Sequence, residues 1–368
     1  MRRVPRTLLA VAATDLPPSI SPDWTPRSAH WKRRSPSRMA LRVGRPLFVG
    51  GCPRSGTTLL QVMLDMHPDL AMPRETNFIR DLYWRRARFG DLRDPANRRA
   101  AAQWIFSDRE HLTRRLLHRR LTPEEAIREI AASPPTIGSI IERCVRLHDP
   151  DAPRWGDKRP AYSGFIGPLL AMFPDAQYVN VVRDPRGVVA SQLAMGWDNP
   201  EIVVPAAVVR WEFSAARTDH FARRLRPDQL LDVRYEDLVA DPQAQVERIL
   251  RFAGLAAGDV VDTMVRGERS GWFVGPHVQA GTPVTTAAVE RWRERLTPAQ
   301  VALVEHAVRP LMERYGYRAV DETEPEPGDI ELLGLRRRIF RRRWRRTRRD
   351  ELLRNARYRW PVVAAGHE

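Results

Sequence analysis

The stretch from Pro46 to His67 has residue types and a spacing that could bind a phosphate group. It opens with a short apolar run, residues 47–49, which indicates a buried strand. Gly51 and Gly56 then bracket a polar loop, and an apolar run with helical spacing follows. A strand, a glycine-bearing loop and a helix aim free backbone N–H groups and the positive end of a helix dipole at one point. The sequence therefore predicts an anion site in this loop.

The spacing from Gly51 to Gly56 to Thr58 matches the P-loop pattern G-x-x-x-x-G-K-[ST], with one departure. Thr57 stands where a P-loop carries the lysine that contacts the β- and γ-phosphates of a nucleoside triphosphate. A nucleoside triphosphate is therefore a poor ligand for this loop. A strand-to-helix turn without any ligand stays the alternative.

A second strand, basic loop and helix are expected at residues 176–191. Residues 176–182 are rich in β-branched side chains and predict a strand that ends at Arg183. Ser191 follows two helical turns later, so the guanidinium and the hydroxyl can reach one phosphate from two sides. Arg186 either adds charge to this site or is simply exposed. We expect both loops at the carboxyl edge of one sheet.

The motif PRSGTT, followed by a helix that ends in LDMHPD and then by Glu-Thr, resembles the 5′-phosphosulfate loop of the sulfotransferases. The likeness is closest to the protein-tyrosine branch and its bacterial relatives. These enzymes use 3′-phosphoadenosine 5′-phosphosulfate (PAPS), whose 5′ end carries one phosphate and a sulfuryl group, so a P-loop without lysine is chemically consistent. The motif R-D-P-R-G-x-x-x-S resembles the 3′-phosphate loop of the same family. The resemblance covers about residues 45–320.

The resemblance also implies roles for individual residues. It implies Glu75 as the general base, and Lys158 with Arg54 as the cations that meet the charge on the leaving group. From the residues alone, Glu75 could instead be a helix-start carboxylate. Donor contacts are implied for Arg54, Ser55, Gly56, Thr57, Thr58, Arg183, Ser191, Tyr235, Ser270 and Thr282, and no metal is expected. Tyr235 could equally be a buried tyrosine near the end of a strand.

The acceptor is not fixed by the sequence. Tyrosine sulfotransferases of secretory compartments carry cysteines beside the base and the lysine, whereas this chain has none there. That departure favours a cytoplasmic enzyme and weakens the case for a protein tyrosine as acceptor. Carbohydrate, glycolipid, small-metabolite and tyrosyl hydroxyls all stay open.

The predicted fold is α/β: a P-loop-like three-layer sandwich with a central, mostly parallel sheet and a helical insertion at residues 81–150. Hydrophobic residues make up 43% of the 368, which is enough for a large core. We expect a disordered basic tail at 1–44, a sulfotransferase domain at 45–320, and an acidic linker with an arginine-rich tail at 321–368. Met39 is a second candidate start residue besides Met1.

The net charge of +16 is concentrated at the two ends of the chain. Residues 1–45 carry +8 and residues 334–360 carry +11, so the body between them is close to neutral. A near-neutral body argues against a nucleic-acid-binding core. Residues 336–349, ten of which are arginines, predict either a basic amphipathic helix for an anionic membrane surface or a disordered tail.

Three functions from different classes compete. A PAPS-dependent sulfotransferase, cytoplasmic or peripheral to a membrane, accounts for both loops together with Glu75 and Lys158. A P-loop kinase or nucleotide-binding protein accounts for the first loop only. A non-catalytic basic protein that tethers to membranes or nucleic acid accounts for the tail only.

Overall fold

The computed structural model describes residues 45–73, 75–107, 121–196, 199–266, 284–320, 323–356 and 362–366. Within these residues lies a five-stranded sheet in the order β2-β3-β1-β4-β5, in which every neighbouring pair is parallel. The strands are β1 (Leu47–Gly51), β2 (Leu70–Ala71), β3 (Arg154–Lys158), β4 (Gln177–Val182) and β5 (Leu230–Arg234). Every residue of β1 and β4 is buried, as is typical of strands covered on both faces.

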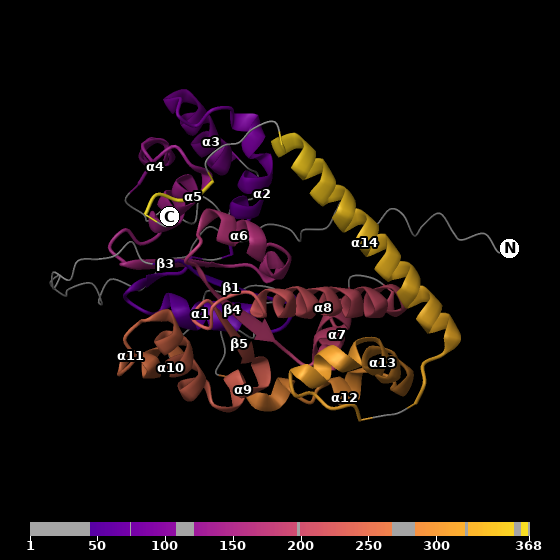
Figure 1. Cartoon of the computed structure of the whole chain (residues 1–368). Helices are drawn as coiled ribbons and strands as arrows, with labels where there is room; N and C mark the ends of the chain where they lie inside the picture. The colour runs from indigo at the N-terminus through magenta and orange to yellow at the C-terminus, as the bar shows by residue number, and fades with distance from the viewer. Residues whose placement is uncertain are drawn as a thin grey trace.

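Helices cover both faces of the sheet (Figure 1). In that view the upper layer consists of α2 (Phe78–Arg85), α3 (Pro95–Ser107), α4 (Pro123–Ala131), α5 (Ile137–Arg146) and α6 (Ile166–Met172), with the short 3₁₀ helices η3 (Arg86–Phe89) and η5 (Pro160–Gly164). The lower layer consists of α1 (Thr57–Asp65), α9 (Tyr235–Ala240), α10 (Pro242–Ala253) and α11 (Val260–Arg266). The predicted three-layer α/β architecture is therefore confirmed.

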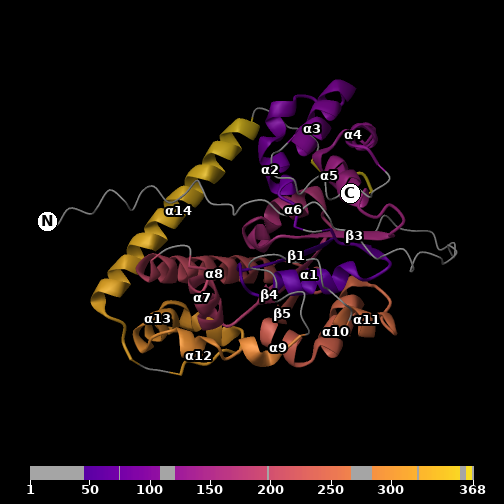
Figure 2. The same cartoon turned by 180° about the vertical axis from the view of Figure 1, so that it is seen from behind.

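A further group of helices packs beside the carboxyl end of β4, around its own apolar cluster. It consists of α7 (Pro185–Leu193), α8 (Pro200–Ala222), α12 (Trp292–Arg295) and α13 (Pro298–Arg314), and the short 3₁₀ helix η7 (Thr286–Ala288) contacts α9. The view from behind shows the same group at the end of the molecule where α7 and α8 lie (Figure 2). This packing fixes the helix that follows the second anion loop.

Local signals account for most helix starts. Thr122 and Glu125 form a capping box at the start of α4, with Pro123 in the first helical turn. Helix α8 begins at Pro200, because the side chain of Asn199 caps it by accepting a hydrogen bond from the N–H of Glu201. Pro205 lies inside that helix.

Beyond residue 320 the chain forms a long helix, α14 (Pro327–Ala356). The arginine-rich segment, residues 336–349, was expected to be either a helix or a disordered tail, and in the structure it is part of this helix. It crosses α8 on the outside of the molecule, and its far end comes close to η3 (Figures 1 and 2). Residues 362–366 return to the upper layer, where the N–H of Ala364 donates to the carbonyl of Met172 at 2.8 Å.

No helix among the described residues has the length and apolar character needed to cross a bilayer. The same residues contain no cluster of histidine, cysteine and carboxylate side chains that could hold a metal ion.

Candidate active site

The loop between β1 and α1 is shaped by two residues with positive φ. Gly56 has φ 93°, and a Cβ atom there would lie 2.5 Å from the ring of Tyr235, so only glycine fits. Arg54 adopts φ 76°, the one positive value among the described non-glycine residues. The first turn of α1 has no side-chain cap and no acidic residue. Its N–H groups therefore remain suited to an anion.

The second loop brings its charged residues onto the first. The Nε of Arg54 donates to the hydroxyl of Ser191 in α7 at 3.2 Å. A guanidinium nitrogen of Arg183, at the end of β4, donates to the carbonyl of Arg54 at 3.1 Å. The two loops, 129 residues apart in sequence, thus form one site because β1 and β4 are neighbours in the sheet.

Tyr235 forms a wall of this site at the start of α9. The guanidinium carbon of Arg183 lies 4.4 Å from the centre of its ring, an arrangement that stabilises a cation. The ring also lies against Gly56. Tyr235 is thus buried and also lies beside both anion loops.

The arrangement of Arg183 fits a phosphate group. It forms no ion pair with any described residue; it donates to the backbone carbonyls of Arg54 and Ala288, and its buried Nε has no partner among those residues. Burial, followed by the positive charge of Arg183, lowers the pKa of Arg54. Two neighbouring guanidinium groups of this kind suit a doubly charged oxyanion.

A second cluster lies on the other side of the first loop. The ammonium of Lys158, at the end of β3, donates to a carboxylate oxygen of Glu75 at 2.7 Å and to the hydroxyl of Thr58 at 3.2 Å. The lysine side chain is 2% exposed and that of the glutamate 35%. The carboxylate is thus the part of this pair that meets solvent and any incoming molecule.

Contacts from two elements hold the segment that carries Glu75. Gln61 of α1 donates to the carbonyl of Pro73, and Arg159 donates to the carbonyls of Thr76 and Asn77 at 3.3 and 3.1 Å. Because the backbone is held on both sides of Glu75, its carboxylate keeps its place beside Lys158. The described residues of this loop, 72–73 and 75–77, form no helix or strand that a periodicity could have predicted.

Asp157 is a buried carboxyl group that the sequence did not single out. It precedes Lys158, is fully buried, and accepts a hydrogen bond from the hydroxyl of Tyr162. Burial raises the pKa of Asp157 to about 7; the Tyr162 hydrogen bond opposes the shift, and the nearby Glu75 carboxylate adds to it. The signal available in the sequence was a charged residue within the strand β3, in which four of the five residues are buried.

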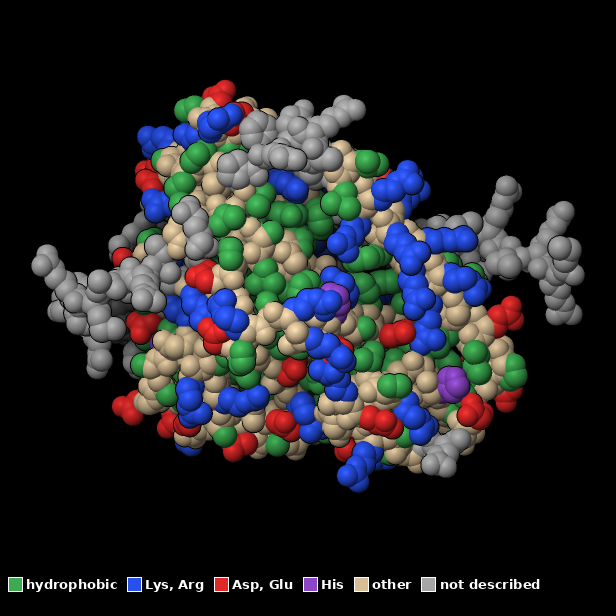
Figure 3. Space-filling model, viewed as in Figure 1, with side chains coloured by type: hydrophobic (Ala, Val, Ile, Leu, Met, Phe, Trp, Pro, Cys, Tyr) green, Lys and Arg blue, Asp and Glu red, His purple; other side chains and the backbone are tan. Residues whose placement is uncertain are grey.

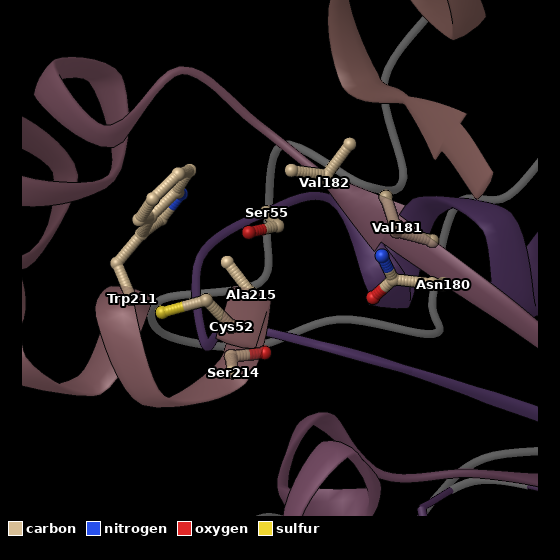
Figure 4. A pocket seen from close by; sticks show the side chains of 8 residues that line it. All are labelled: Cys52, Ser55, Asn180, Val181, Val182, Trp211, Ser214 and Ala215. Carbon is tan, nitrogen blue, oxygen red and sulfur yellow. The ribbon is translucent and has the colours of Figure 1, made fainter. Parts of the chain in front are cut away.

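A small cavity of about 10 Å³ lies behind the first loop (Figure 4). Its polar lining includes Cys52, Ser55, Asn180 and Ser214, and its apolar wall includes Trp211. The buried hydroxyl oxygen of Ser55 has no partner among the described residues. The space suits about one water molecule, and the hydroxyl of Ser55 forms part of its lining.

Three further residues named from the sequence, Arg186, Ser270 and Thr282, do not add to the site that the structure describes. Arg186 neither adds charge to the site nor is exposed: it is buried and forms ion pairs with Asp184 and Glu305, both at 2.6 Å. Ser270 and Thr282 lie outside the described residues.

Comparisons with known proteins agree with this geometry. A profile of the sulfotransferase family matches residues 46–259. Protein-tyrosine sulfotransferase A of Caenorhabditis elegans is 28% identical over 286 residues, which cover 74% of this chain and 67% of that protein. The protein-tyrosine sulfotransferase of Drosophila melanogaster is 27% identical over 220 residues, which cover 58% of this chain and 39% of that protein. The chain thus spans only part of the length of these relatives.

Solved structures show the same fold. The sulfotransferase domain of the Synechococcus PCC 7002 olefin synthase has a TM-score of 0.56 at 26% identity, covering 75% of this chain and 96% of that domain. The sulfotransferase domain from the curacin biosynthetic pathway has a TM-score of 0.55 at 20% identity, covering 75% and 99%. Since the family profile also spans more than half of the sequence, this chain belongs to the sulfotransferase family.

Proposed function

We propose that this chain transfers a sulfuryl group from PAPS to a hydroxyl group of an acceptor, with Glu75 as the general base. One observation supports the proposal most: the Glu75–Lys158 pair and the Arg54–Arg183 pair flank the same phosphate loop. A base and two sets of cations around one anion site are what such a transfer requires.

The two loops would hold the donor by its two ends. The N–H groups of residues 56–58 and the Arg54 guanidinium would take the 5′ end, whereas the N–H of Ser55 donates to the carbonyl of Cys52 at 3.1 Å. Arg183 with Ser191 would take the 3′-phosphate, beside the ring of Tyr235. Ser270 and Thr282 stay predicted contacts. When bound, the donor supplies an activated sulfuryl group whose transfer releases adenosine 3′,5′-bisphosphate.

Glu75 would take the proton of the acceptor hydroxyl. As that proton moves to the carboxylate, the acceptor oxygen forms a bond to sulfur, and the bond between sulfur and the 5′-phosphate oxygen breaks with its electron pair leaving on the phosphate side. The hydrogen bond from the ammonium of Lys158, at 2.7 Å, holds the carboxylate of Glu75 in place. Lys158 also contacts Thr58 at the loop, so its charge is near the side where negative charge grows.

A kinase is the weaker alternative for this site. It would need a cation at position 57, where the chain has threonine. Lys158 occupies neighbouring space, but its ammonium is engaged by Glu75.

We also propose a cytoplasmic location, because both cysteines are free and buried rather than joined in a disulfide.

The test uses labelled PAPS and a panel of tyrosyl peptides, carbohydrates, glycolipids and small hydroxylated compounds, followed by mass analysis. Glu75→Gln should lower kcat by about 10²–10⁴ with little change in donor affinity, the range expected for a general base. Glu129→Gln, which alters an ion-paired glutamate on α4 away from the site, serves as the control. Near-normal turnover of Glu75→Gln on the true acceptor would remove Glu75 from this role.

A further inference from the structure

Helix α14 is attached to the body by one of its faces. Leu333 is buried, and the rings of Phe340 and Trp344 lie 5.0 and 5.6 Å from that of Phe213 in α8. Arg337 forms an ion pair with Glu212 at 2.8 Å. These contacts fix the rotation of α14, so its opposite face must point away from the molecule.

The outward face is strongly basic. Over twelve residues the helix has eight exposed arginines: Arg338, Arg341, Arg342, Arg343, Arg345, Arg346, Arg348 and Arg349. Among the described residues the one carboxylate that pairs with any of them is Asp350, at 3.9 Å from Arg346. In the space-filling view their side chains form a continuous band where α14 lies (Figure 3).

This concentration of charge opposes helix formation. Arginines three and four residues apart, such as Arg338, Arg342 and Arg346, repel one another along the helix. A chain segment with so many like charges gains most when an extended anionic surface neutralises them together. The exposed face is thus suited to a polyanion rather than to a single small anion.

Apolar side chains on the same face identify which polyanion it suits. Ile339 is 47% exposed and Leu353 is 59% exposed, and both project from the side of the helix opposite Phe340 and Trp344. Such side chains gain free energy in the acyl region of a bilayer and none from a phosphodiester backbone. The aromatic residues that could stack on nucleic-acid bases are instead packed against α8.

We propose that the arginine face of α14 docks on an anionic lipid bilayer, with Ile339 and Leu353 entering the headgroup region. The inference is independent of the proposed reaction, since none of these residues belongs to the catalytic site. Docking would be electrostatic and would weaken as salt increases.

The experiment measures partition of the full chain onto vesicles of phosphatidylcholine alone and of phosphatidylcholine mixed with phosphatidylglycerol. The wild type should bind the mixed vesicles only. The triple variant Arg342→Glu, Arg345→Glu and Arg349→Glu should bind them at least about tenfold more weakly, because each arginine near an anionic surface contributes separately. The matched control, Arg248→Glu, Arg251→Glu and Arg266→Glu on α10 and α11, changes the net charge equally and should bind almost as the wild type does.

A second variant, Ile339→Asn with Leu353→Asn, keeps every charge. It tests docking on the bilayer even if the charge reversal unfolds the helix. It should bind the mixed vesicles about threefold or more weakly and a DNA duplex unchanged. The proposal is overturned if the α14 and control triple variants lose vesicle binding equally. It is also overturned if the apolar variant binds vesicles as the wild type does while the wild type binds the duplex tightly.

Discussion

At the scale of single residues, Asp157 makes the stability of the site depend on pH. Its folded pKa of about 7, caused chiefly by burial, lies above the value of about 3.9 expected in an unfolded chain. The folded chain therefore keeps a proton that the unfolded chain releases between these values. The stabilisation from this proton is fully present below about pH 4 and is lost as the pH rises to about 7.

Asp157→Asn should remove that loss, because an amide does not titrate while its oxygen can still accept the hydrogen bond from Tyr162. The measurement is the free energy of unfolding in urea at several pH values from about 5 to about 8. The wild type should lose more stability over this interval than the variant does. Asp262→Asn, at an exposed position of α11, is the control and should follow the wild type. Equal pH dependence in the wild type and Asp157→Asn would contradict the assignment.

The motifs placed some distant residues in one site before their proximity was seen. The sequence named Glu75 and Lys158, 83 residues apart, and the structure places their charged atoms 2.7 Å apart. It failed for Arg186, because the partner that buries that arginine, Glu305, lies 119 residues further on and belongs to α13. No local pattern contains such a distant ion pair.

At the scale of elements, the site rests on two strand–loop–helix units side by side. β1 with α1 and β4 with α7 place their loops at the same edge of the sheet, since the two strands pair in parallel. The sequence predicted both units, because glycine spacing and buried strands are local signals. It did not predict the loop around residues 72–77, whose shape depends on contacts from Gln61 and Arg159.

Arg183→Ala tests whether the second unit binds the 3′-phosphate. The variant should bind adenosine 3′,5′-bisphosphate about 10–100-fold more weakly, the loss expected for a charge-assisted hydrogen bond. The affinity of Arg183→Lys, which keeps the charge, should fall between those of the wild type and Arg183→Ala. Ser191→Ala should lower the affinity less than Arg183→Ala does. Isothermal titration calorimetry supplies the affinities, with Arg248→Ala on α10 as the control. Unchanged affinity in Arg183→Ala would remove this loop from donor binding.

At the scale of the whole molecule, the segment beyond residue 320 packs on the domain that precedes it. Besides the contacts of α14 with α8, Ala364 is buried and the N–H of Gly138 in α5 donates to the carbonyl of Val362 at 3.0 Å. The sequence divided the chain at residue 320 from a change in composition. That signal reports charge and proline content, whereas the packing depends on the few apolar side chains among the arginines.

Deletion of residues 334–368 should therefore lower the melting temperature by several degrees. It exposes Phe213 and removes two half-buried aromatic side chains, each of which contributes part of the roughly 1.5–3 kcal/mol expected for a fully buried one. Phe340→Ala in the full chain should reproduce part of the shift. We expect transfer to a small soluble acceptor to survive the deletion below the new melting temperature. If the truncated chain has the same melting temperature as the full chain, α14 contributes nothing to the stability of the domain.

Binding of adenosine 3′,5′-bisphosphate without a metal ion tests the central claim most directly, because it requires both anion loops and no acceptor. With the chelator EDTA present, the bisphosphate at about 100 times its Kd should stabilise the fold by roughly 2.7 kcal/mol and raise the melting temperature. ATP with magnesium should give a clearly smaller shift, since the loop has threonine in place of the P-loop lysine. A shift seen with ATP and magnesium but absent with the bisphosphate would contradict the account.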